Sequence, residues 1–157
     1  MANFNEYLAY KDNGEYSTKQ LKIMEKIELS EDSISKIKSI NKEINILAVA
    51  QVFCPDCRAV VPFLEKFSRL NNKIKITYSS RDESQDILKG KTGVAKIPTV
   101  FYNDGKELHT MLIEFPNVVI DAINADPDNY DDIKYNFRIG KFNSEIEKEL
   151  VNYLLSL

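Results

Sequence analysis

Apolar residues recur every three or four positions through the first 43 residues, the spacing of one face of an amphipathic helix. The recurring residues are Phe4, Tyr7 and Leu8, then Leu21, Met24 and Ile27, and finally Ile34, Ile37 and Ile40. Ser17, with Gln20 three residues later, matches a capping box and predicts that the second helix begins there. Ser30 predicts the start of the third helix, because the acidic residues that follow it favour a helix N-terminus. We therefore expect residues 1–43 to form a helical extension.

From Ile44 the pattern changes to strands that alternate with helices. The run INILAVAQVF, Ile44–Phe53, is almost continuously apolar, as expected of a central strand that is buried on both faces. Helical spacing returns in Arg58–Leu70, Lys73–Ser79 alternates as a second strand, and Asp82–Lys89 has the pattern of a short helix. Strands separated by helices predict parallel pairing, because the crossover helix brings the chain back in the same direction.

A hairpin and a final helix complete the predicted order of elements. Two strands lie in IPTVFYNDGKELHTMLI, Ile97–Ile113, and the turn residues Asn103 to Gly105 between them are a strong hairpin signal. Helical spacing returns from Asn143, with an apolar face made of Ile146, Leu150, Tyr153 and Leu154. This order predicts an α/β fold in which helices flank a mixed sheet, with the parallel strands first and the antiparallel hairpin after them.

The segment at about 114–142 is the least determined part of the chain, and the sequence leaves its structure open. Four aspartates crowd in its middle: Asp126, Asp128, Asp131 and Asp132. A calcium-binding loop needs alternating oxygen ligands with a glycine in the middle and a Glu at the end. Because that glycine is missing, the aspartates favour a solvated turn or helix start over a calcium site.

Length and composition indicate a single domain, residues 1–157, whose 43% apolar and 29% charged residues are typical of a soluble globular protein. The net charge is −3 and the basic residues are spread along the chain, so no basic stripe is available to gather phosphates. The N-terminus has no basic start followed by an apolar run, and no run approaches the ~18 apolar residues that span a bilayer. We expect no secretory signal, no membrane or nucleic-acid partner, and a cytoplasmic location, where thiols stay reduced.

The two cysteines of the chain, Cys54 and Cys57, carry the candidate chemistry. C-P-D-C by itself is compatible with a redox pair, with part of a metal site, or with simple packing. Cys54 follows the buried strand and Cys57 falls in the first turn of the next helix, where Pro55 suits the helix start. Unpaired N–H groups and the positive end of the helix dipole therefore point at the Cys54 sulfur. Such a position lowers a thiol pKa from ~8.5 to ~7 or below and favours the thiolate at neutral pH.

A zinc site would need more ligands than the chain offers near these cysteines. A structural zinc site takes four ligands, whereas the chain adds a single histidine, His109, in a predicted strand. Asp56 or a second chain would have to complete the set. We therefore expect no metal and no organic cofactor, and we interpret His109 as a half-exposed strand residue.

Three parts of the sequence together resemble the thioredoxin fold. They are F-C-P-D-C-R at Phe53–Arg58, Pro62 in the following helix, and K-I-P-T-V-F-Y-N-D-G-K-E at Lys96–Glu107. The resemblance covers about Ile44 to Ile113 and the final helix, and it implies a thioredoxin-like three-layer fold with a core over 44–157. The helical extension and the G-K-F-N at 140–143 are also similar to a bacterial thioredoxin-like group that carries an N-terminal extension.

The resemblance also implies a thiol–disulfide oxidoreductase. Cys54 would be the nucleophile and Cys57 the resolving cysteine of a reaction that passes through a mixed disulfide. Pro98 would lie opposite the cysteines in a cis peptide and leave the Ile97 backbone for an extended substrate strand. The implied substrate-binding residues are Phe53, Pro55, Asp56, Ile97 and Pro98. The implied partners are a protein or small-molecule disulfide and an unidentified electron donor; the alternative is a non-enzymatic binding module or redox sensor.

Several positions depart from the thioredoxin pattern. Ala48 stands where thioredoxins carry a buried Asp, and Phe53 stands where they usually carry Trp. Pro-Asp replaces Gly-Pro between the cysteines, which brings the Asp56 carboxylate near a thiolate that it disfavours. Arg58 and the helix terminus act in the opposite sense. Arg81 is a candidate to offset Asp56, although the sequence favours a solvated helix cap for Arg81-Asp82-Glu83. These departures predict slow or substrate-restricted chemistry.

Overall fold

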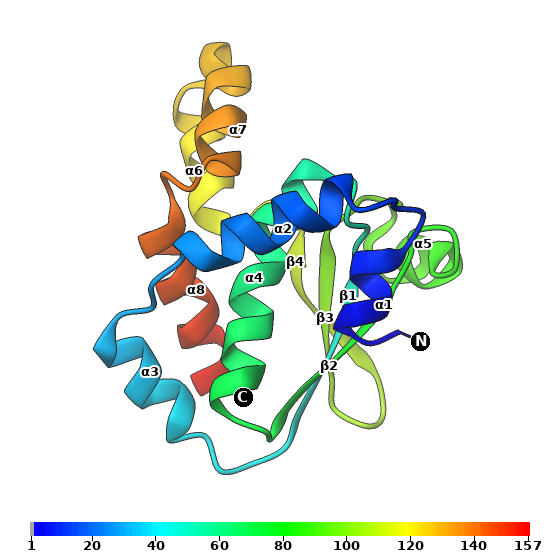
Figure 1. Ribbon diagram of the computed structural model, residues 1–157, viewed down its shortest axis with the longest axis vertical. Coiled ribbons are helices and arrows are strands. Elements are labelled where there is room, and N and C mark those ends of the chain that lie inside the picture. The colour runs from blue at the N-terminus through cyan, green and yellow to red at the C-terminus, as the bar shows by residue number, and fades with distance from the viewer. Residues whose placement is uncertain (1) are drawn as a thin grey trace.

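A four-stranded mixed sheet forms the centre of the computed structural model, which describes residues 2–157 (Figure 1). Its strands are β1 (Ile44–Val49), β2 (Ile74–Ser79), β3 (Thr99–Asn103) and β4 (Leu108–Ile113), in the spatial order β2-β1-β3-β4. β1 pairs with β2 in parallel, whereas β3 pairs antiparallel with both β1 and β4. This topology confirms the predicted mixed sheet. β1 is shorter than the apolar run Ile44–Phe53, because the last residues of that run form the loop that leads to Cys54.

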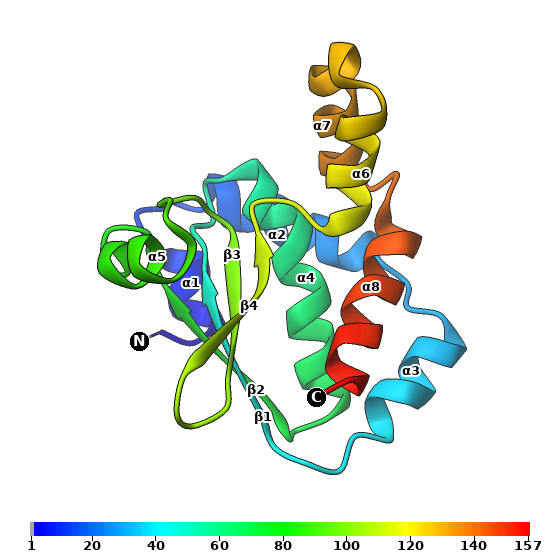
Figure 2. The same cartoon turned by 180° about the vertical axis from the view of Figure 1, so that it is seen from behind.

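Helices cover both faces of the sheet. α4 (Pro55–Leu70) and α8 (Asn143–Leu155) lie on one face, and α5 (Gln85–Thr92) lies on the other (Figure 2). α5 begins later than predicted and ends where Gly93 adopts a left-handed φ of 80°. The hydrophobic core includes Val49, Phe63, Phe67, Phe101, Ile146 and Leu150. None of the helices within residues 2–157 combines the length and the apolar character needed to cross a membrane.

Three helices precede the first strand, as the sequence predicts. They are α1 (Phe4–Ala9), α2 (Glu15–Lys26) and α3 (Glu31–Lys38). α3 begins after Ser30, whose side chain caps it as expected. The predicted start of α2 is wrong, because Gly14 is its N-cap and Ser17 lies in its first turns. The Asp12 carboxylate accounts for the difference, since it accepts a hydrogen bond from the Ser17 N–H at 2.9 Å.

Aromatic side chains fix α1 to the edge of the sheet. The rings of Phe4 and Tyr7 lie 6.1 and 5.0 Å from the ring of Tyr78 in β2. Ala2 also forms a single antiparallel bridge with Tyr78. Farther along, α2 packs against α4, and α3 packs against both α4 and α8. The helical extension therefore shares its buried residues with the core around the sheet.

The segment that the sequence leaves open forms a helical hairpin that projects from one end of the molecule (Figures 1 and 2). It consists of α6 (Asn117–Ala125), a short 3₁₀ helix (Pro127–Asn129) and α7 (Tyr130–Arg138). The aspartate-rich stretch forms the 3₁₀ helix and the first turn of α7, the turn and helix start that the sequence favours. At the base of the hairpin, Phe137 is fully buried and meets Phe115 edge-on, at 5.7 Å between ring centroids.

Candidate functional site

Cys54 lies at the junction between the loop after β1 and the start of α4. It is the N-cap of α4, and Pro55 occupies the first helical position. The Cys54 sulfur accepts a hydrogen bond from the Cys57 N–H, with a distance of 3.4 Å between nitrogen and sulfur. Cys54 is half-buried, whereas the side chain of Cys57 is fully buried, and both thiols are free. The structure thus confirms the predicted placement of the pair at the helix N-terminus.

The two thiols have opposite acidity. The pKa of Cys54 falls to about 7, mainly because it accepts a hydrogen bond from the Cys57 side chain and another from the Cys57 backbone. Burial and the Asp56 charge oppose this effect but do not cancel it. Burial raises the pKa of Cys57 well above its ordinary value, and the hydrogen bond to Cys54 raises it further. At neutral pH, Cys54 therefore has substantial thiolate character, while Cys57 stays protonated.

The loop before β3 faces the cysteines. The peptide bond between Ile97 and Pro98 is cis, as the resemblance implies, and the Ile97 carbonyl oxygen lies 3.9 Å from the Cys54 sulfur. The Pro98 carbonyl accepts a hydrogen bond from the Glu114 N–H at 2.6 Å, which ties this loop to the end of β4. Sequence positions 43 apart thus meet at the candidate site.

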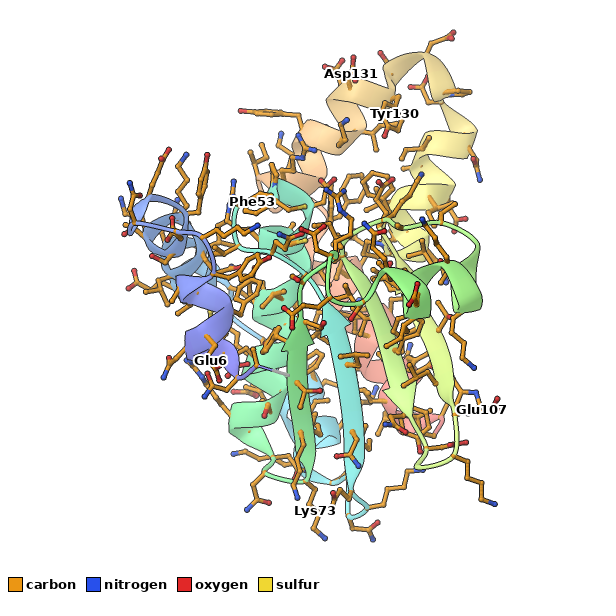
Figure 3. The ribbon with its side chains drawn as sticks, turned by 90° about the vertical axis from the view of Figure 1, so that its right-hand side faces the viewer. Glu6, Phe53, Lys73, Glu107, Tyr130 and Asp131 are labelled. Carbon is orange, nitrogen blue, oxygen red and sulfur yellow. The ribbon has the colours of Figure 1, made fainter. Side chains whose placement is uncertain are left out.

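Phe53 provides an exposed apolar surface next to Cys54. Its side chain is 37% exposed, although it follows a run of buried residues. Figure 3 shows Phe53 at the end of the sheet from which the α6–α7 hairpin projects, with Tyr130 and Asp131 labelled on that hairpin. Phe53 and Pro55 flank Cys54 in the chain, and the carbonyl of Ile97 faces its half-buried sulfur.

Asp56 forms an ion pair that the sequence does not reveal. Its carboxylate oxygens Oδ1 and Oδ2 lie 2.7 and 3.3 Å from Nε and Nη2 of Arg138, the last residue of α7. Arg81, the candidate that the sequence offered for this role, is exposed, and the Asp56 carboxylate pairs with Arg138 instead. Arg138 lies 82 positions from Asp56 in a segment without a clear pattern, so no local signal could have indicated the contact.

Arg58 is held by contacts on the side of α2. Its guanidinium donates to the Val52 carbonyl at 2.8 Å and lies over the ring of Tyr16, 5.3 Å from the ring centroid. The side chain therefore braces the loop that precedes Cys54, a role that the local sequence does not indicate.

A buried chain of neutral polar groups lies behind the cysteines. Tyr7 donates to the Gln20 side-chain oxygen at 2.8 Å, and the Gln20 amide donates to the Arg58 carbonyl at 3.1 Å. Both side chains are buried and both come from the helical extension. Ala48, where thioredoxins carry an acid, is buried in β1 and adds no polar group. The buried polar groups that α1 and α2 supply here, the Tyr7 phenol and the Gln20 amide, are thus uncharged.

His109 does not belong to the cysteine site. It pairs with Asp104 at 2.8 Å in the β3–β4 hairpin and groups with Glu107 rather than with any cysteine. Figure 3 shows Glu107 at the opposite end of the sheet from Phe53. A zinc site that combines His109 with Cys54 and Cys57 in one chain is therefore excluded by the fold.

The fold and the cysteine junction together define a thioredoxin-fold protein with a thiol pair at a helix N-terminus. The chain belongs to the thioredoxin family, whose model, described as Thioredoxin, matches residues 1–132. The sequence resemblance is therefore confirmed, and the family and the cysteine pair fit a thiol redox role.

Two solved structures share this fold. One is a protein of unknown function from Pseudomonas aeruginosa, with 18% sequence identity and a TM-score of 0.76 over 99% of this chain and 90% of that one. The other is an HIV epitope scaffold, with 17% identity and a TM-score of 0.76 over 99% and 93% of the two chains. No curated protein matches the sequence significantly.

Proposed function

We propose that the protein is a thiol–disulfide oxidoreductase that uses Cys54 and Cys57 as its redox pair. The observation that carries the proposal is the asymmetry of the two thiols. Cys54 is accessible, with a pKa lowered to about 7, whereas Cys57 is fully buried, with a raised pKa. A reactive thiolate with a protonated thiol behind it is the arrangement that two-step disulfide exchange requires.

In the proposed reaction, the Cys54 thiolate attacks one sulfur of a substrate disulfide. A Cys54–substrate disulfide forms, the substrate S–S bond breaks, and the first substrate thiolate leaves. Cys57 then loses its proton and attacks the Cys54 sulfur, which releases the second substrate thiolate and forms the Cys54–Cys57 disulfide. The substrate gains two electrons and the protein loses two, so a dithiol electron donor must restore the pair for the next cycle.

Substrate docking in this proposal uses the surface around the half-buried sulfur. Phe53 offers an exposed apolar side chain, Pro55 and Asp56 begin the helix, and the backbone at Ile97 and Pro98 offers an edge for an extended segment. This surface suits a polypeptide disulfide or a small-molecule disulfide with a flexible chain. The reductive direction also needs a compartment that re-reduces the pair, such as the cytoplasm.

Reduction of insulin with dithiothreitol as the electron donor tests this function. We expect the wild-type protein to accelerate insulin precipitation and Cys54→Ser to abolish the acceleration. In a separate reaction without dithiothreitol, pre-reduced Cys57→Ser should accumulate a covalent mixed disulfide with insulin, because Cys54 can attack but no second thiol resolves the product. No acceleration by wild type, together with no mixed disulfide in Cys57→Ser, would favour a non-enzymatic thioredoxin-like binding module instead.

A further inference from the structure

Asp56 is an acidic residue placed between the two redox cysteines and mostly withdrawn from solvent. Its side chain is 10% exposed, and it lies in the first turn of α4. A carboxylate this close to Cys54 works against formation of the thiolate, since two like charges repel. A positive charge that pairs with Asp56 would reduce this repulsion and favour the Cys54 thiolate near neutral pH.

Arg138 meets that need with a two-point contact. Its guanidinium donates from Nε to Oδ1 at 2.7 Å and from Nη2 to Oδ2 at 3.3 Å, and the Arg138 side chain is 33% exposed. Two parallel hydrogen bonds fix the direction of the carboxylate as well as its distance from the guanidinium. Asp56 in turn raises the pKa of Arg138, and the Cys54 charge does so too, which places Arg138 within electrostatic reach of the sulfur.

Charged and titratable groups reach Cys54 from three helices. α4 supplies Cys57 and Asp56, α1 supplies the buried phenol of Tyr7, and α7 supplies Arg138. Burial keeps Cys57 and Tyr7 protonated, because it raises the pKa of each well above its ordinary value. Two arginines add positive charge near these groups: Arg138, which pairs with Asp56, and Arg58 of α4, whose guanidinium instead donates to the Val52 carbonyl and lies over the Tyr16 ring.

The end of α7 is built to hold Arg138 in place. Its neighbour Phe137 is fully buried against Phe115, which anchors the backbone. Two residues beyond Arg138, Gly140 adopts a left-handed φ of 94°, where a Cβ would come within 2.8 Å of the Asn143 side chain. The Gly140 N–H donates to the Phe137 carbonyl and closes the turn into α8. Arg138 also lies beyond residues 1–132, which match the family model.

We propose that Arg138 is a positioning residue of the cysteine site, which holds the Asp56 carboxylate in an ion pair and so lets Cys54 act as a thiolate at neutral pH. The inference deepens the proposed redox function and rests on it for its purpose. The effect of the Arg138–Asp56 ion pair on ionisation of the Cys54 thiol is a property of the reduced protein, so it can be measured without any catalytic turnover.

The pH profile of Cys54 alkylation tests the proposal with three variants of the full-length reduced protein. The rate of reaction with iodoacetamide is measured between pH 5 and pH 10, and mass spectrometry identifies the modified cysteine. We expect Arg138→Gln to move the profile about one unit higher, since Asp56 is then unopposed, and to slow alkylation at pH 7 about fivefold. Asp56→Asn should move the profile lower, and the double variant Asp56→Asn/Arg138→Gln should return close to wild type.

A charge-keeping variant separates electrostatics from a merely structural tie. If Arg138 only anchored α7 through its two-point contact, Arg138→Lys and Arg138→Gln would shift the profile alike, because neither keeps that contact. Arg138→Lys, which keeps the charge but loses the two-point contact, should shift the profile less than Arg138→Gln. Circular dichroism and thermal unfolding confirm that each variant is folded.

Two results would overturn the proposal: an unchanged profile in folded Arg138→Gln, or a double variant that stays shifted. If Arg138→Gln does not fold, Asp56→Asn alone decides, because an unchanged profile in that variant contradicts the proposal. Insulin reduction by wild type, measured in parallel, keeps the two hypotheses apart. Shifted alkylation profiles without insulin reduction would contradict the proposed enzymatic function and support the effect of the ion pair on Cys54. Insulin reduction with unchanged profiles would support the enzymatic function and contradict the role proposed for Arg138.

Discussion

Cys54 and Cys57 differ chemically because one turn of helix separates their environments. Cys54 caps the helix at its accessible end, where hydrogen bonds from Cys57 stabilise the negative charge. Cys57 lies inside, where burial disfavours that charge. The start of α4 therefore supplies both the nucleophilic thiolate of Cys54 and the protonated thiol of Cys57, which resolves the mixed disulfide in the second step. The C-P-D-C spacing is what brings the two into one turn.

The Cys57 side chain is the main source of the low Cys54 pKa, so its removal should raise that pKa. We expect Cys57→Ala to move the pH profile of Cys54 alkylation upward from about 7, toward the ordinary thiol value. The matched control is Cys57→Ser, which keeps a hydroxyl donor and should shift the profile less. An identical profile for Cys57→Ala and wild type would show that the helix N-terminus alone sets the Cys54 pKa.

The buried Tyr7–Gln20 hydrogen bond should contribute measurably to stability. Tyr7→Phe removes the hydroxyl and leaves the Gln20 side-chain oxygen without its donor, and we expect a loss of about 1–2 kcal/mol in the free energy of unfolding. Urea denaturation measures the change. Tyr135→Phe is the matched control, because Tyr135 is 61% exposed and should change stability little. Equal effects of the two substitutions would contradict the assigned role of Tyr7.

At the scale of the elements, the extension is joined to the last helix by a buried carboxylate. Glu147 of α8 accepts hydrogen bonds from the Ser30 N–H at 3.2 Å and from the Ser33 hydroxyl at 2.9 Å. The carboxylate therefore occupies the N-terminus of α3, where unpaired N–H groups and the helix dipole favour a negative charge. Two helices at opposite ends of the chain are fixed to each other in this way.

Loss of this carboxylate should destabilise the fold. Glu147→Ala leaves the buried Ser33 hydroxyl without its acceptor, and we expect a loss of about 1–3 kcal/mol in the free energy of unfolding. Thermal or urea unfolding measures it. Glu145→Ala removes an exposed carboxylate from the same helix and serves as the control, with an expected change of a few tenths of a kcal/mol. A similar cost for both would mean that the contact with α3 adds little.

Elements with a regular apolar period were predictable, and those held by distant contacts were not. β1, β2, the β3–β4 hairpin and α8 follow directly from alternation, helical spacing and turn residues. The start of α2 was misplaced because the capping box at Ser17 competes with the Asp12 carboxylate, which bonds the N–H groups of the first turn. The sequence leaves the α6–α7 hairpin open, although Tyr130, Ile133 and Phe137 lie at helical spacing in α7, because each of its two helices is only 9 residues long.

At the scale of the whole molecule, the redox potential depends on how far the folded protein stabilises the reduced pair. A thiol pKa near 3.5 marks an oxidant whose reduced form is strongly stabilised, whereas a pKa near 7 gives little such stabilisation. With a Cys54 pKa of about 7, we expect a reduction potential near about −270 mV. Equilibration in dithiothreitol redox buffers, followed by thiol counting, measures it. A potential near about −120 mV would contradict the proposed reductive direction.

The sequence by itself determined the order of strands and helices outside residues 114–142, the junction that holds Cys54 and Cys57, and the proline loop at Pro98, because local periodicity or a short motif specifies each of them. Only the tertiary structure decided that Arg138 pairs with Asp56, that Tyr7 and Gln20 line the core behind the cysteines, and that His109 lies at the far end of the sheet. These contacts join residues up to 82 positions apart. Hydrogen bonds and ion pairs of this kind form only where the packing of helices and strands brings distant side chains together. Local sequence patterns do not predict such contacts.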